Sequence, residues 1–151
     1  TGITVAGITN TSGTIAATLA ASCTASAGSV RFEASDGNQS GSGDLQLDVA
    51  ANTNPVLSYA DQSVGSGGGG AISPATGPGD NGSVTTIAVQ NAGTFTGTIS
   101  VNAAGVVTLA NAAPSGPHTV TIRATDNCTA TTDASFSLIV GADALFANGF
   151  E

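Results

Sequence analysis

Apolar and polar residues alternate along the segment Pro117–Val140. The alternation is interrupted by the polar pair Asp126-Asn127, whose side chains tolerate turn geometry. A period of two is typical of strands that bury one face. The pattern therefore predicts a β-hairpin whose inner face carries Val120, Ile122, Ala124, Ala134, Phe136, Leu138 and Val140.

The same pattern occurs earlier in the chain, at Ser29–Val49. Aligning Asp36 with Asp126 places inner positions on inner positions throughout, with one residue of length difference in the turn. A repeated unit of this kind indicates a tandem array. We expect burial of Val30, Phe32, Leu45 and Leu47 in the first unit and of Val120, Ile122, Phe136 and Leu138 in the second, with Arg31, Glu33 and Arg123 pointing outward.

The repeat predicts an all-β chain of two units and a tail. Residues 1–51 form an incomplete first unit, residues 52–141 a complete β-sandwich of about seven strands, and residues 142–151 a C-terminal tail. The first unit has no counterpart of Pro55–Gly82, so its opening strand is expected to be missing. Besides the two hairpins, we expect strands at Ile3–Ile8, Thr14–Ala21, Val56–Tyr59, Ser83–Gln90, Phe95–Val101 and Gly105–Leu109.

Glycine and proline are concentrated in Ser63–Gly82, which we expect to be a long surface loop with one short strand near Ala71–Ser73. The run Gly67–Gly70 within it is not a phosphate-binding loop. No Lys or Ser/Thr follows at the required spacing, and no helix is expected after it.

Composition and charge exclude several classes of partner. Ten acidic residues stand against two arginines, for a net charge of −8, and a field of this sign repels nucleic acid and anionic membrane surfaces. No apolar run is long enough to cross a bilayer. We therefore expect no nucleic-acid partner and no membrane insertion. Low charge and the absence of lysine fit a secreted bacterial surface protein, and since no signal peptide is visible we expect a mature or trimmed form.

Part of the sequence resembles a known class of repeats. Asn54–Leu57, the glycine-rich stretch and residues 97–127 (GTISVNAAGVVTLANAAPSGPHTVTIRATDN) are similar to the immunoglobulin-like and cadherin-like repeats of bacterial secreted and surface proteins. The resemblance implies tandem immunoglobulin-like β-sandwich units, the first incomplete, of a kind that serves as stalks, adhesins and spacers. The terminal LFANGFE resembles the tail of many secreted gammaproteobacterial proteins, which implies export and a natural C-terminus.

Cys23 and Cys128, the two cysteines, allow one disulfide and exclude a cysteine-rich metal cluster. Cys23 precedes the penultimate strand of the first unit, at the end where the chain leaves for the second. Cys128 lies in the last hairpin turn of the second unit, which in an immunoglobulin-like topology is at the end where the chain enters. We predict a Cys23–Cys128 disulfide that clamps the units. The alternatives are two free buried thiols or bonds between chains.

Cadherin repeats hold calcium at the joints between domains. The joint here, Asn52–Pro55, has the Asn and Pro of that pattern without its aspartates, and no Asp-Arg-Glu motif occurs. Calcium prefers several carboxylate or carbonyl oxygens, so this joint gives it little support. We interpret Asp36-Gly37-Asn38 and Asp126-Asn127 as hairpin turns and Asp80-Asn81-Gly82 as a loop. We expect no cofactor and no metal site.

Catalysis is the least favoured function. His118 is the single histidine, and no nucleophile-elbow motif accompanies it to form a hydrolytic triad. The acids are scattered over turns and outer faces, whereas a glycosidase needs two carboxylates facing a cleft. We expect His118 to be exposed at a strand end, and we predict no catalytic residue.

Two functional hypotheses remain. The repeat and the weakly charged surface favour a structural or adhesive extracellular module that binds other copies of itself or neighbouring repeats. The alternative is a carbohydrate-binding or spacer module of a larger secreted bacterial enzyme or adhesin, with a glycan as partner. Sugar-binding modules usually present exposed aromatic platforms, for which Tyr59 and five phenylalanines offer little.

The tail Ala142–Phe150 carries Leu145, Phe146 and Phe150, with nothing of its own to cover them. An incomplete first unit would expose a sheet edge and an apolar groove. Strand addition between molecules would cover both the exposed edge of the first unit and the apolar side chains of the tail. These three residues are therefore the predicted partner-binding residues, and the contact could propagate as a filament. The alternative is a fragment of a longer array whose missing strand has been trimmed away, with an unbound tail.

Overall fold

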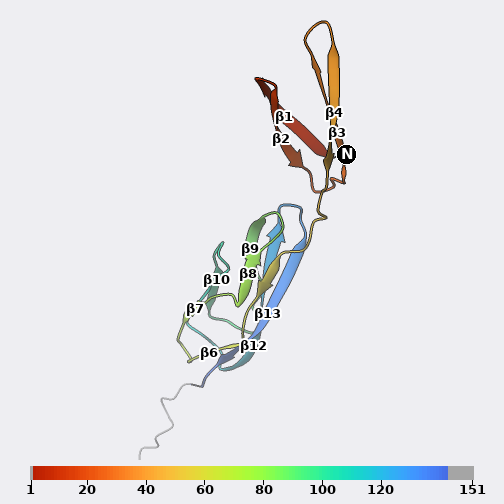
Figure 1. The fold of residues 1–151 in the computed structure, drawn as a ribbon. Helices are drawn as coiled ribbons and strands as arrows, with labels where there is room; N and C mark the ends of the chain where they lie inside the picture. Colours follow the sequence, from red (N-terminus) through yellow and green to blue (C-terminus); the bar gives the residue numbers. More distant parts are fainter. Residues whose placement is uncertain (1, 143–151) are drawn as a thin grey trace, which may run out of the picture. The chain divides into compact units, whose positions relative to one another are not determined.

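The computed structural model describes residues 2–142. These residues form strands, turns and loops and no helix, which confirms the all-β class. The chain divides into two compact units, unit 1 (Thr1–Asn52) and unit 2 (Thr53–Glu151), each of which is drawn in Figure 1. The division lies one residue later than the predicted boundary. Leu145, Phe146 and Phe150 lie outside the described residues.

The strands of unit 2 form two sheets and a separate short pair. One sheet has the order β6-β13-β12-β9, the other has the order β10-β11-β7, and β5 pairs with β8. Side chains from both sheets contribute to one buried apolar cluster, an arrangement consistent with a β-sandwich. The strands are β5 (Val56–Ser58), β6 (Gln62–Val64), β7 (Gly70–Ile72), β8 (Thr76–Gly79), β9 (Val84–Asn91), β10 (Thr98–Val101), β11 (Val107–Ala110), β12 (Gly116–Asp126) and β13 (Thr131–Val140).

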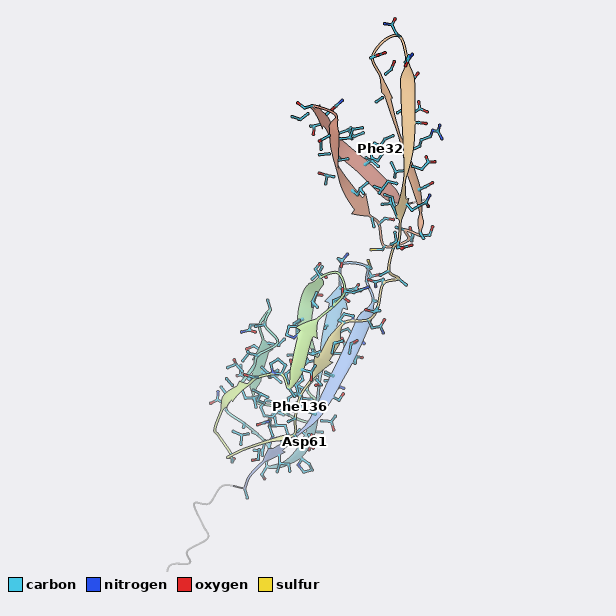
Figure 2. The ribbon with its side chains drawn as sticks, in the orientation of Figure 1. Phe32, Asp61 and Phe136 are labelled. Atoms are coloured by element: carbon cyan, nitrogen blue, oxygen red, sulfur yellow. The ribbon has the colours of Figure 1, made fainter. Side chains whose placement is uncertain are left out.

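The β12–β13 hairpin supplies the largest part of this core. Val120 lies opposite Phe136, and Ile122 lies opposite Ala134. All four are buried, as is Leu138, so the predicted core of unit 2 is confirmed (Figure 2). The opposite face of the hairpin is mainly polar, although Ile139 is exposed on it. There the guanidinium of Arg123 points outward, as expected, and donates two hydrogen bonds of 2.7 and 2.8 Å to the carboxylate of Asp133.

The glycine-rich segment contains the predicted short strand as β7, and it differs from the prediction in that β8 and the end of β6 also lie within it. Its glycines allow close approach of neighbouring backbones. A Cβ on Gly69 would overlap the carbonyl oxygen of Leu109, and one on Gly77 would overlap that of Val56. Glycine here permits strand pairing where any side chain would prevent it.

Unit 1 consists of two antiparallel hairpins. The first joins β1 (Ile3–Thr11) to β2 (Thr14–Ala21), and the second joins β3 (Gly28–Ser35) to β4 (Ser40–Leu47). The pairing of β3 with β4 follows that of β12 with β13, since Val30 lies opposite Leu45 as Val120 lies opposite Phe136. The alignment of the two hairpins in the sequence is therefore confirmed at the level of register.

Burial of the inner face of unit 1 was predicted wrongly. Val30, Phe32 and Leu47 are half-buried, and Leu45 is 44% exposed. The two hairpins of unit 1 diverge from each other (Figure 1). Within residues 2–52, β1 pairs only with β2 and β3 only with β4, so no strand takes the places that β6, β7 and β9 take in unit 2. An apolar face without a second layer stays in contact with solvent, which explains the exposure.

Candidate functional site

Unit 1 contains an apolar groove between β2 and the β3–β4 hairpin. Its volume is about 710 Å³. Its walls come from three strands. The groove is lined by Ile15, Ala16, Ala17 and Leu19 of β2, Phe32 and Ala34 of β3, and Gly41, Ser42, Gly43, Asp44 and Leu45 of β4.

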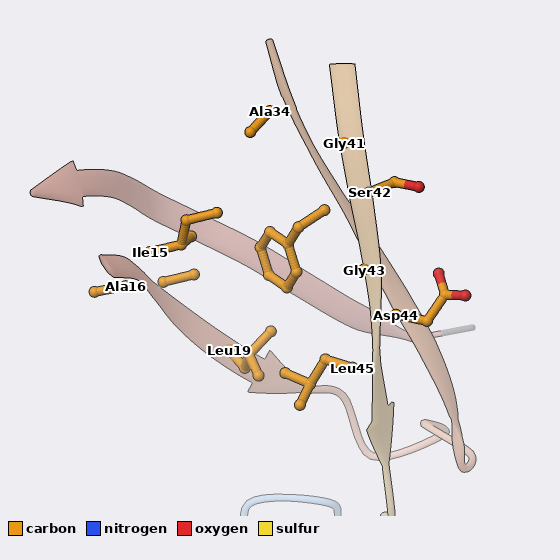
Figure 3. A pocket seen from close by; sticks show the side chains of 11 residues that line it. Ile15, Ala16, Leu19, Ala34, Gly41, Ser42, Gly43, Asp44 and Leu45 are labelled. Atoms are coloured by element: carbon orange, nitrogen blue, oxygen red, sulfur yellow. The ribbon is translucent and has the colours of Figure 1, made fainter. Parts of the chain in front are cut away.

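Large apolar side chains of the groove are open to solvent. Ile15 is 42% exposed and Leu19 is 38% exposed on β2, and Leu45 faces them from β4 (Figure 3). Sequence reasoning predicted the strand Thr14–Ala21 without recognising that its residues line a site. The alternation of Ile15, Ala17 and Leu19 was the available signal. A contiguous exposed apolar surface of this kind typically marks a binding site.

The polar groups of β4 face away from the groove (Figure 3). On that outer face, the guanidinium of Arg31 lies 3.3 Å from the Glu33 carboxylate and 3.8 Å from that of Asp44. Arg31 also donates a hydrogen bond of 2.6 Å to the hydroxyl of Ser42. The charges of the hairpin are thus paired with one another on one face, which leaves the other face apolar.

Unit 2 shows how the equivalent surface is closed. Its β11 and β13 flank a space that β6 and β7 cover, because β7 pairs with β11 and β6 pairs with β13. The space that remains beside Leu109 and Leu138 measures about 80 Å³. The carboxylate of Asp61, just before β6, accepts a hydrogen bond of 2.8 Å from the Ser137 amide and holds this segment in place (Figure 2).

The groove of unit 1 corresponds to that covered space. In the repeat, β4 matches β13, and β2 precedes β3 as β11 precedes β12. Within residues 2–52, β2 pairs only with β1 and β4 only with β3, so each has a second edge with backbone groups facing outward. The groove therefore combines an apolar floor with sheet edges that can accept a further strand.

His118 is buried, contrary to the predicted exposure, with 4% of its surface accessible. It lies on the inner face of β12, where its Nε2 is 2.8 Å from the Pro114 carbonyl oxygen and its Nδ1 is 2.8 Å from the Thr94 hydroxyl. A carbonyl oxygen only accepts, so Nε2 carries the proton. The ring also packs edge-on against Phe95 at a centroid distance of 5.7 Å. Both nitrogens are engaged in structural contacts.

The acidic residues assigned to turns are confirmed in that role. Asp36 accepts hydrogen bonds from the amides of Asn38 and Gln39, and these bonds lower the pKa of its carboxyl group. Asp126 likewise accepts from the amides of Cys128 and Ala130, at 2.8 Å each. In the 2–142 range, no group of three or more His, Cys, Asp or Glu side chains is arranged to hold a metal ion.

Both cysteines are disulfide-bonded, so the predicted bond between Cys23 and Cys128 is present. Disulfides persist in oxidising compartments, which suggests an extracytoplasmic environment for the chain. Over the part of the chain that the structure describes, no helix has the length and apolarity needed to cross a membrane.

Comparison with known proteins establishes no family for this chain. No protein-family model matches it, and no curated protein does. Among solved structures, the endo-fucoidan hydrolase MfFcnA9 from glycoside hydrolase family 107 is similar over 93% of this chain at 18% identity, with a TM-score of 0.39. The match spans 28% of the hydrolase chain. A similarity this low carries no inference about activity.

Proposed function

We propose that the chain is a non-enzymatic extracellular structural module that assembles with copies of itself by strand complementation. The observation that supports the proposal is the groove of unit 1. It is open at about 710 Å³, whereas the equivalent space in unit 2 is covered by strands of its own chain. A strand bound there would pair with a free sheet edge and cover the apolar side chains. The disulfide supports an extracellular location.

The strand that we propose as occupant is Ala142–Phe150 of a neighbouring copy. It follows directly after β13, where the Gly141 amide donates a hydrogen bond of 2.8 Å to the Val64 carbonyl. At about 3.3 Å per residue, this segment spans roughly 30 Å when extended. That is sufficient to run the length of β4, which has 8 residues. Leu145, Phe146 and Phe150 give the segment apolar side chains, and those on its inner face can cover the apolar lining of the groove.

The contact between two copies is heterologous, because the groove belongs to unit 1 and the donor segment follows unit 2. In a heterologous contact the two binding surfaces differ, so every copy that is added brings a new groove and a new donor segment. Repetition produces a ring or an open filament. A role as a surface fibre or adhesive stalk follows from that mode of assembly.

Deletion of Ala142–Glu151 tests the proposal. Far-ultraviolet circular dichroism verifies that both units keep their fold in the deletion variant. We expect the full chain to form particles that grow with concentration, as seen by light scattering and electron microscopy, and the deletion variant to stay monomeric. A synthetic peptide of the tail added to the full chain should shorten the particles by filling the grooves.

Equal particle size for the full chain and the deletion variant would show that the tail is not the donor. Retention of the monomer on insoluble polysaccharide would instead favour a carbohydrate-binding module. The buried position of Tyr59, with 9% of its surface exposed, argues against that alternative, since a sugar platform needs an exposed ring.

A further inference from the structure

The floor of the groove contains an open space above two glycines of β4. Gly43 lies opposite Phe32, and Gly41 lies opposite Ala34, all on the inner face of the hairpin. A Cβ added to either glycine would meet no atom within 4 Å. In unit 2, the position of Gly43 is occupied by Ala134, which is buried by its own chain. The missing side chains leave room for a bulky group supplied by a partner.

The tail sequence has one face suited to that space. Residues of even number between 142 and 150 are Ala142, Ala144, Phe146, Asn148 and Phe150, and those of odd number up to 151 include Asp143 and Glu151. In a strand the two sets lie on opposite faces. Facing the odd set inward would desolvate the carboxylate of Asp143, the acid within the donor strand, in an apolar groove, at a large cost in free energy. The even set therefore faces inward.

We propose that Phe146 of a neighbouring copy occupies the space above Gly43, beside Phe32. This inference rests on the proposed function, and it names the register of the donor strand. Phe146 is central in Ala142–Phe150, so a strand centred on Gly43 keeps backbone pairing on both sides of the contact. An aromatic ring over a strand glycine covers backbone that the glycine leaves exposed. Leu145 then lies on the outer face of the donor.

A side chain added at Gly43 tests whether Phe146 occupies the space above this residue. In Gly43→Leu the Cβ meets no atom within 4 Å, and we expect the rest of the side chain to occupy the space proposed for Phe146. Circular dichroism checks that unit 1 keeps its fold. Ser29→Leu is the matched control, because Ser29 lies on the outer face of the same hairpin and is exposed. We expect Gly43→Leu to raise the concentration needed for assembly roughly tenfold or more, and Ser29→Leu to leave it unchanged. Equal behaviour of the two variants would overturn the proposal.

Substitutions in the tail test the register separately. We expect Phe146→Ser to weaken assembly by roughly tenfold or more, and by a larger factor than Leu145→Ser does. If Leu145→Ser has the equal or larger effect while deletion of the tail still abolishes assembly, the register is wrong and the proposed function stands. If deletion of the tail has no effect, the proposed function itself fails.

Discussion

The buried side chains of His118 and Tyr59 in unit 2 are both hydrogen-bonded within the core. His118 bridges the Pro114 carbonyl and the Thr94 hydroxyl, and the Tyr59 hydroxyl donates a hydrogen bond of 2.6 Å to the Gly105 carbonyl. The ring of Tyr59 also packs on Phe136 at a centroid distance of 5.2 Å. Because a buried polar group without a partner costs free energy, these pairings hold the loops around Gly105 and Pro114 to the core.

Tyr59 gives a prediction at this scale. Burial raises the pKa of its phenol above 10.0. The folded state therefore holds the proton more tightly than the unfolded state does. The contribution of the protonated Tyr59 phenol to the stability of the fold is complete below pH 10.0 and is lost as the pH rises through the raised pKa. Since Tyr59 is the single tyrosine of the chain, absorbance of the phenolate reports it directly. Ionisation at or below pH 10.0 in the folded protein would contradict this expectation.

Removal of the Tyr59 hydroxyl gives the matching stability experiment. Tyr59→Phe leaves the Gly105 carbonyl without its donor in a buried site. We expect a loss of about 1–3 kcal/mol in the free energy of unfolding, measured by urea denaturation. An unchanged free energy would mean that water replaces the lost partner.

At the scale of elements, the two repeated hairpins share a register and differ in burial. Phe136 is 3% exposed on β13, whereas Phe32 on β3 is only half-buried. The difference arises from the neighbouring strands, since β12 and β13 are flanked by β9 and β6 and are covered by a second sheet. The same alternation of apolar and polar residues therefore contributes differently to the free energy of unfolding in the two units.

A pair of truncations measures that difference. Phe136→Ala is expected to cost about 3–5 kcal/mol in the free energy of unfolding, because it opens a cavity in a packed core. Phe32→Ala is expected to cost less than about 1 kcal/mol in the unassembled chain, since its ring is partly solvated already. Both are measured by chemical denaturation at concentrations below assembly. A loss well below about 1 kcal/mol for Phe136→Ala would mean that the register of the hairpin is wrong.

At the scale of the whole molecule, the disulfide closes a long loop of the chain. About 105 residues separate Cys23 from Cys128. Closing a loop of this length restricts the unfolded chain, which by the chain-entropy model contributes about 4–5 kcal/mol. We expect reduction, or the double variant Cys23→Ser with Cys128→Ser, to lower the denaturation midpoint. Peptide mapping without reductant that finds both thiols free would contradict the bond.

The sequence alone determined the strands that show an uninterrupted period of two. Hairpins β3–β4 and β12–β13, their matching registers and the core of unit 2 follow from which residues alternate, because alternation is a local property of the backbone. The strand Thr14–Ala21 was also predicted at its observed bounds. The pairing of Cys23 with Cys128 followed from where the repeat places each cysteine.

Only the tertiary structure decided what covers each alternating face. His118 has the parity of Val120 and Ile122, yet its burial depends on Thr94 and Phe95, which are distant in the sequence. The strands around Gly69 and Gly77 depend on how closely Leu109 and Val56 approach them. Unit 1 shows the same limit most clearly. Its inner face has the pattern of a core, and it forms an open groove because burial requires a second layer that the local pattern does not specify.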